Sequence, residues 1–98
     1  MKAAVLYGAN DLRYETVDTP MCPEKGILLK VIACGICGSD LRTYGGGSSR
    51  AQYPSVSGHE IAGEIVESQN LNFPVGAKLS VAPVIACGHC WYCKNGIQ

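Results

Sequence analysis

The sequence predicts a mainly β fold, in which short strands curl into a barrel or a sandwich. Short apolar runs bounded by glycine, proline, asparagine and aspartate recur along the chain, which is the pattern of strands and turns. Residues 39–44 are the one segment with a helix-start signal. With 98 residues, of which 47% are apolar and 16% charged, the chain can form one small globular domain.

The individual elements follow from the pattern of apolar runs and turn residues. Strands are expected at residues 2–8, 12–17, 27–33, 61–67 and 78–84. Residues 8–11, Gly-Ala-Asn-Asp, form the turn between the first two strands, so these two strands should pair as a hairpin. Gly63 marks a bulge or a close backbone approach in its strand. One helical turn is expected at 39–44, with Ser39 as its N-cap and Asp40 in its first turn.

The charge pattern excludes several classes of partner. The formal net charge is zero, and no run of lysine or arginine appears, which argues against nucleic acid and against an anionic membrane surface. The apolar run at 3–7 is too short for a signal peptide, and no later run reaches a membrane-spanning length. We therefore expect a cytoplasmic protein whose cysteines are reduced thiols or metal ligands.

The six cysteines allow several interpretations. Cys22 has no partner nearby in sequence and is interpreted as a small packed or half-exposed thiol. Cys34 and Cys37 form a Cys-x-x-Cys pair, which occurs in thioredoxin-like redox sites, but that requires a βαβ setting that the surrounding glycines disfavour. A four-cysteine zinc ribbon would join this pair to Cys87 and Cys90, across a gap far longer than the usual ~15–20 residues.

A third interpretation combines Cys37 with His59 and Glu60, which follow Gly58 at the start of a strand. Thiolate, imidazole and carboxylate are all zinc ligands, and three protein ligands with an open fourth position are typical of catalytic zinc. Glycines beside these residues would let the backbone approach a bound ion closely. Cys37, His59 and Glu60 are therefore candidate ligands of a catalytic metal.

Four motifs, GICGSD, GHEIAGEIV, VGAKLSVAP and CGHCWYCKNG, occur in this order. Through these ordered motifs the whole chain resembles the N-terminal part of the GroES-like catalytic domain of zinc-dependent medium-chain alcohol and polyol dehydrogenases. The resemblance implies a partly open β-barrel with one short helical turn and a cysteine-rich zinc lobe from about residue 86. It also implies that residues 1–98 form part of that domain, without the nucleotide-binding domain.

The resemblance assigns roles to individual residues. Cys37 and His59 match the first two ligands of the catalytic zinc, and Glu60 matches a carboxylate that is a direct ligand in polyol-type members. Asp40 matches the residue that orients the zinc-bound histidine, and Ser39 matches the hydroxyl that relays the proton of the alcohol. Cys34 matches no ligand and is expected in the core. Tyr44 could line the substrate pocket, although packing is the commoner role of a tyrosine that ends a helical turn.

The implied reaction is hydride transfer between a secondary alcohol or polyol and NAD or NADP. Zinc would act as a Lewis acid that lowers the pKa of the alcohol. The resemblance further implies a homo-oligomer, either dimer or tetramer. No Gly-x-Gly-x-x-Gly fingerprint occurs in the sequence, so residues 1–98 by themselves are expected to be inactive.

Cys87, Cys90 and Cys93 resemble three of the four thiolate ligands of the family's structural zinc lobe, whose fourth cysteine would lie beyond this chain. The lobe is therefore expected to be incomplete and poorly metallated, and His89 is a poor substitute in a tight loop. Two alternatives remain open. The first is a stand-alone small zinc-binding or redox module, and the second is a co-chaperonin-like ring protein that shares the fold.

Overall fold

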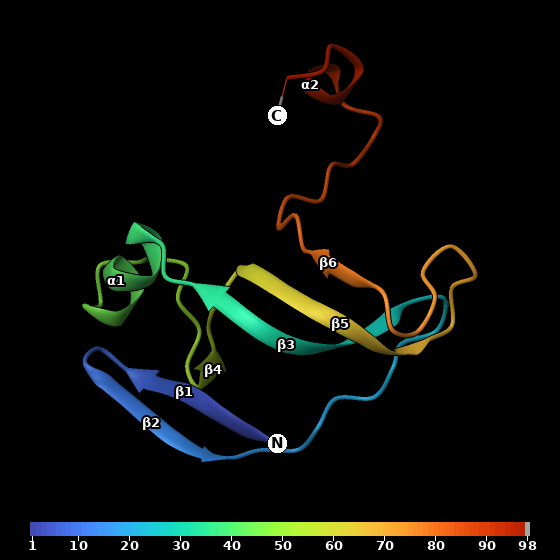
Figure 1. The fold of residues 1–98 in the computed structure, drawn as a ribbon. Helices are drawn as coiled ribbons and strands as arrows, with labels where there is room; N and C mark the ends of the chain where they lie inside the picture. Colours follow the sequence, from blue (N-terminus) through green and yellow to red (C-terminus); the bar gives the residue numbers. More distant parts are fainter. Residues whose placement is uncertain (98) are drawn as a thin grey trace.

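Two antiparallel three-stranded sheets make up the body of the molecule in the computed structural model, which describes residues 1–97 (Figure 1). The first sheet has the order β2-β1-β4 and the second β3-β5-β6. Their strands are β1 Lys2–Gly8, β2 Asp11–Thr16, β3 Ile27–Gly35, β4 Ser55–Val56, β5 Glu60–Ser68 and β6 Lys78–Ser80. The prediction of a mainly β fold is confirmed, although β4, a strand of two residues, was not expected from the sequence.

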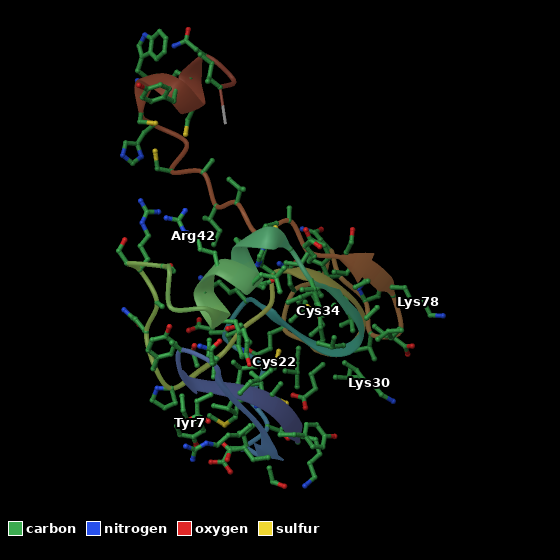
Figure 2. The ribbon with its side chains drawn as sticks, turned by 90° about the vertical axis from the view of Figure 1, so that its left-hand side faces the viewer. Tyr7, Cys22, Lys30, Cys34, Arg42 and Lys78 are labelled. Carbon is green, nitrogen blue, oxygen red and sulfur yellow. The ribbon has the colours of Figure 1, made fainter. Side chains whose placement is uncertain are left out.

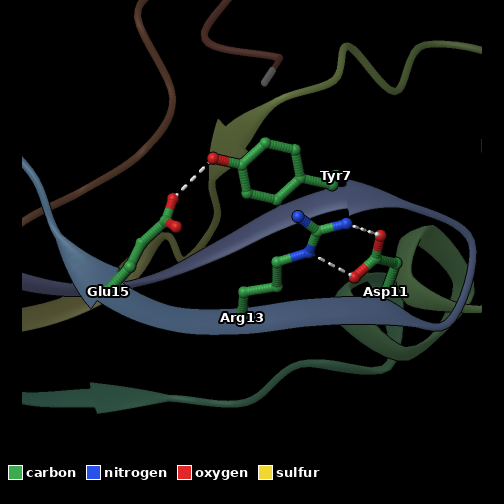
Figure 3. A network of polar contacts seen from close by, with 4 residues as sticks. All are labelled: Tyr7, Asp11, Arg13 and Glu15. Carbon is green, nitrogen blue, oxygen red and sulfur yellow. Dashed lines mark hydrogen bonds and ion pairs between the residues drawn. The ribbon is translucent and has the colours of Figure 1, made fainter.

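The β1–β2 hairpin confirms the predicted turn. Asn10 takes a left-handed conformation, φ 61°, which asparagine tolerates better than most residues. On the outer face of the hairpin, the Arg13 guanidinium pairs with both carboxylate oxygens of Asp11 at 2.7 and 2.8 Å and lies 4.3 Å from the centre of the Tyr7 ring (Figure 3). The Tyr7 hydroxyl donates to Glu15 at 2.7 Å. This exposed polar network joins the two strands through their side chains.

The antiparallel pairing of β3 with β5 is the longest strand pairing among the described residues. It runs from Ile27 opposite Ser68 to Gly35 opposite Glu60. The predicted bulge or close approach at Gly63 is confirmed. The register shifts next to the Val31–Gly63 pair, and a Cβ atom at Gly63 would lie 2.7 Å from the carbonyl oxygen of Lys30. Only glycine lets the two backbones approach this closely.

Helix α1 spans Gly38–Tyr44, so it begins one residue earlier than the predicted segment 39–44. Its N-cap is Cys37, so the expectation that Ser39 caps the helix is wrong. The Asp40 carboxylate accepts the Cys37 amide at 2.8 Å, and this reach back to the N-cap backbone sets the helix start. A second helix, α2 Trp91–Lys94, was not expected, because its four residues lie within the cysteine motif.

The strands of residues 1–97 form two separate sheets and no closed barrel, in agreement with the partly open fold that was expected. Two further expectations need correction. The last strand, expected at 78–84, ends at Ser80; the Val81 amide still donates to the carbonyl oxygen of Ile61 at 2.9 Å, and Pro83 has no amide hydrogen with which to extend the pairing further. Cys34 is exposed rather than part of the core, because it faces the open space between the two sheets (Figure 2). The expected domain included residue 98, which lies outside the described residues.

The buried core is small for so apolar a sequence. Among the described residues, the buried hydrophobic side chains are Ala3, Val5, Leu6 and Ile65. The radius of gyration is 15.8 Å, against the about 13 Å of a compact domain of about 100 residues. The segment after β6 carries α2 away from both sheets, which accounts for the extended shape (Figure 1). None of the helices formed by residues 1–97 has the length and apolar character needed to cross a membrane.

Candidate metal centre

Cys37, His59 and Glu60 come together at one end of the second sheet. A ligand atom from each lies within 4.8 Å of the other two. The arrangement follows from antiparallel pairing, because the last residue of β3, Gly35, is opposite the first residue of β5, Glu60. Two segments that are distant in sequence are thereby joined, one leaving β3 into α1 and one entering β5.

The Asp40 carboxylate connects the two sides of this cluster. Its Oδ1 atom lies 3.4 Å from Nδ1 of His59, while its Oδ2 atom accepts the backbone amide of Cys37. The Asp40 side chain is 22% exposed and that of His59 is 37% exposed, so the pair is only partly screened by water. A carboxylate on one ring nitrogen fixes the orientation of the imidazole and leaves the other nitrogen for a ligand.

The electrostatics of the cluster favour a thiolate at Cys37. Hydrogen bonds from the Ser39 hydroxyl and then the Ser39 amide lower the pKa of the Cys37 thiol, and a further hydrogen bond from His59 acts in the same direction. The pKa of His59 is raised, first by its hydrogen bond to Cys37 and also by the charge of Asp40. Glu60 opposes ionisation of Cys37 through its own negative charge. The side chains of Cys37, Asp40 and Glu60 can each carry a negative charge, and a bound cation would stabilise these charges.

The glycine before His59 also has a structural reason. Gly58 has φ 121°, a conformation that side chains other than glycine rarely adopt, and a Cβ atom there would lie 2.8 Å from Sγ of Cys34. Gly58 therefore lets the chain turn into β5 directly over Cys34, which places His59 at the cluster. The sequence alone shows a glycine beside His59 but not this contact with Cys34.

A second cluster is formed by Cys87, Cys90 and Cys93. Cys87 precedes α2, Cys90 is its N-cap and Cys93 lies within it. The Sγ atom of Cys93 lies 3.4 Å from that of Cys90 and 3.6 Å from that of Cys87. Hydrogen bonds from the amides of His89 and Cys90 lower the pKa of Cys87 to about 7. The His89 ring is instead directed to the carbonyl oxygen of Cys87, 2.9 Å from Nδ1.

The two clusters are separate, which decides between the interpretations of the cysteines. Cys37 groups with His59 and Glu60, and Cys87 and Cys90 group with Cys93, so the four-cysteine ribbon is wrong. Cys34 belongs to neither cluster in the described part of the chain. Its thiol is directed to the carbonyl oxygen of Gly35, a weak contact at 3.6 Å. A redox pair with Cys37 has no support in this geometry.

An apolar cavity of about 380 Å³ lies beside the first cluster. Its lining comes from the hairpin, the end of β3 and helix α1, and includes Leu6, Leu12, Ile36, Leu41 and Tyr44. Asp40 lines this cavity, whereas Cys37, His59 and Glu60 do not. Tyr44 is thus placed against apolar side chains behind the cluster.

With this geometry described, comparison with known proteins identifies the family. Residues 23–98 match the model of the alcohol dehydrogenase GroES-like domain. The chain belongs to this family. The sorbitol dehydrogenase of Bacillus subtilis (strain 168) is 42% identical over 101 residues, which cover 98% of this chain and 29% of that protein.

Solved structures of relatives agree with this assignment. The zinc-dependent alcohol dehydrogenase 2 of Streptococcus pneumonia is 32% identical, with a TM-score of 0.83 over 98% of this chain and 28% of its own. An alcohol dehydrogenase of E. coli CFT073, complexed with NADH, is 34% identical with a TM-score of 0.79, over 98% of this chain and 28% of its own. The chain therefore spans less than a third of the length of these relatives, and it corresponds to part of a zinc-type medium-chain dehydrogenase.

Proposed function

We propose that residues 1–98 supply the metal-binding part of an enzyme that transfers a hydride between a secondary alcohol or polyol and NAD or NADP. The observation that carries the proposal is the set of one thiolate, one imidazole and one carboxylate whose ligand atoms lie within 4.8 Å of one another. This donor set fits Zn²⁺, since three protein ligands leave a fourth position for the oxygen of a substrate. Bound there, zinc would supply Lewis-acid chemistry toward an alcohol oxygen.

Each side chain of the cluster has a separate task in this proposal. Cys37, whose pKa is lowered chiefly by Ser39, and His59 are the principal ligands, and Glu60 is the third. Because Nδ1 of His59 faces Asp40, Nε2 is the nitrogen available to the metal. Asp40 is a positioning residue, which holds the ring and the start of α1 in one orientation.

The Ser39 hydroxyl is proposed to receive the proton that the alcohol loses before its hydride departs. Ser39 follows Cys37 by two residues, on the first turn of α1, and is exposed to solvent. A hydroxyl can accept one proton while donating its own, which suits a relay between a substrate and water. The proton would then pass outward from the site.

The cluster of Cys87, Cys90 and Cys93, which we call the thiol lobe, is proposed to bind a structural zinc ion. Its three sulfur atoms and the local amide donors around Cys87 resemble a tetrahedral thiolate site with one position still to be filled. Metal binding to such a lobe is coupled to its folding, so zinc should order the three cysteines and the start of α2.

The nicotinamide cofactor, the oligomer and the compartment belong to the same proposal. No Gly-x-Gly-x-x-Gly motif occurs in the sequence, so we expect that the 98-residue chain alone does not reduce NAD or NADP. Binding of the dinucleotide and assembly into a dimer or tetramer would involve parts that the longer relatives possess. Six free cysteines favour the reducing environment of the cytoplasm.

A chimera would test the proposed function. Residues 1–98 would replace the matching region of the Bacillus subtilis sorbitol dehydrogenase, and reduction of NAD and NADP would be followed with a panel of secondary alcohols and polyols. We expect alcohol-dependent turnover in the chimera and none when Cys37 is replaced by serine. A folded, zinc-loaded chimera without turnover would contradict the proposal and favour a stand-alone zinc-binding module.

A further inference from the structure

A close approach of β3 and β5 lies next to the metal cluster. Gly35 is the last residue of β3 and is paired with Glu60, the first residue of β5. A Cβ atom built on Gly35 would overlap Oε2 of Glu60, and it would lie only 3.0 Å from Cβ and 3.3 Å from Cδ of Glu60. The side chain of Glu60 thus occupies the space that any other residue at position 35 would fill.

This spacing differs from that of an ordinary strand pair. Directly opposed residues in an antiparallel ladder have Cβ atoms about 4.5–5.5 Å apart. At the Gly35–Glu60 pair the corresponding separation would be 3.0 Å, so the glycine lets β5 begin nearer to β3 than a pair of side chains would permit. No left-handed φ accounts for this glycine, because Gly35 is not among the residues with positive φ.

The close approach acts on all three members of the cluster. Cys37 follows Gly35 by two residues, and His59 precedes Glu60 by one. A wider separation at the Gly35–Glu60 pair would move the segment that carries His59 away from Cys37. If the backbones held their places, the Glu60 carboxylate would have to rotate away from Gly35. Either response changes the spacing of the three ligand atoms.

We propose that Gly35 is a positioning residue for the metal centre, which keeps the Glu60 carboxylate and His59 within reach of the ion held by Cys37. This inference rests on the proposed zinc site and adds to it a residue with no ligand atom of its own. Gly35 acts only through the space it leaves, so its effect should disappear when the Glu60 side chain, including its Cβ atom, is removed.

The test uses cobalt(II) as a spectroscopic probe in the 98-residue chain with Cys22, Cys34, Cys87, Cys90 and Cys93 replaced by serine, so that Cys37 is the remaining cysteine. The thiolate-to-cobalt charge-transfer band reports Cys37, and the ligand-field bands report the number and geometry of the ligands. Zinc affinity is measured by competition against the bound cobalt. In this background Gly35→Ala should alter the ligand-field bands, retain the charge-transfer band, and lower zinc affinity by roughly 10–100-fold, the range for residues that support a ligand.

Two matched glycine variants separate positioning from general damage. Gly63→Ala also introduces a close contact, 2.7 Å from the carbonyl oxygen of Lys30, in the same strand pair away from the cluster. It should reduce stability while leaving the cobalt spectrum unchanged. Gly38→Ala lies beside Cys37 but meets no atom within 4 Å, and it should change neither property. A Gly63→Ala spectrum altered in the same way as that of Gly35→Ala would overturn the inference.

A double-mutant cycle with Glu60→Gly completes the test. Gly35→Ala should have little further effect on the cobalt spectrum and zinc affinity of the Glu60→Gly chain, because both the overlapping carboxylate and the Cβ atom 3.0 Å away are gone. If Gly35→Ala alone fails to fold, recovery of the folded chain and of the Cys37 band by adding Glu60→Gly supports the inference, and failure of the double variant overturns it. A parent chain that shows no Cys37 band contradicts the zinc site itself. A normal parent with an unaltered Gly35→Ala spectrum contradicts only the role of Gly35.

Discussion

The two sulfur-containing clusters of this chain are built in opposite ways. The first joins Cys37 to His59 and Glu60 through the pairing of β3 with β5, so it exists only when distant segments meet. The thiol lobe takes its three sulfur atoms from one short stretch at the start of α2, which stands away from both sheets (Figure 1). One site depends on the tertiary fold, and the other depends on local backbone geometry.

The two clusters also differ in the origin of the hydrogen bonds that lower the pKa of their cysteines. At Cys37 the hydrogen bonds come from Ser39 and from His59, a residue on another strand. At Cys87 the largest contributions come from the amides of His89 and Cys90, within the same turn. The first cluster should therefore respond to changes in sheet stability, whereas the thiol lobe should respond to changes in its own sequence alone.

The largest expected effect is the selective loss of one metal site. Cys37→Ser should weaken metal binding at the first cluster by more than the ~10–100-fold typical of supporting residues, because a direct thiolate ligand is removed. Cys90→Ser should do the same to the thiol lobe. Metal content after dialysis against a chelator measures both. Since the clusters share no residues, the two effects should be independent. A single substitution that empties both sites would show that the two sites do not form independently.

The second effect tests dependence on the sheet. Ile65 lies in β5 and is fully buried, so Ile65→Ala should lower the free energy of unfolding by about 2–5 kcal/mol. Metal affinity at the first cluster should fall with it, while the thiol lobe keeps its affinity. Denaturant titration and zinc competition give the two quantities. Val66→Ala, at an exposed neighbouring position of the same strand, serves as the control and should change both only slightly.

The third effect concerns the carboxylate that bridges the first cluster. Asp40→Asn retains the shape of the side chain but removes the charge that raises the pKa of His59. The His59 resonances in the metal-free chain should then titrate at lower pH, and zinc affinity should fall by about 10–100-fold. Asp11→Asn, which disturbs a carboxylate paired with Arg13 on the hairpin, is the control. An unchanged His59 titration would show that Asp40 does not act on the ring.

The smallest effect is a pH dependence confined to the thiol lobe. Because the pKa of Cys87 is lowered to about 7, its thiolate predominates above that pH, and the stabilisation it gives to the metal-free lobe is lost as the pH falls through about 7. Alkylation of Cys87, followed by peptide mass mapping, should reach half its limiting rate near pH 7. Cys90→Ser should move this midpoint little, since backbone amides are the main cause. A midpoint near the about 8.5 of a free cysteine would contradict the local hydrogen bonding.

Motif spacing in the sequence was enough to predict the features that depend on neighbouring residues. The hairpin turn and the thiol lobe are local patterns, and the structure contains both of them. The pairing of Cys37 with His59 and Glu60 came from motifs and a family resemblance, and the structure brings their ligand atoms together. Their role as zinc ligands stays a proposal.

Tertiary structure alone decided the features that depend on contacts across the chain. Alternation of apolar residues does not state which strands pair, so the division of the strands into two three-stranded sheets was not predicted. The exposure of Cys34 depends on the open space between those sheets. That Cys37 rather than Ser39 is the N-cap of α1 depends on the hydrogen bond that the Cys37 amide donates to the Asp40 carboxylate. The contact between Gly35 and Glu60 is likewise invisible in sequence, because it is set by strand register, and register is a property of two segments together.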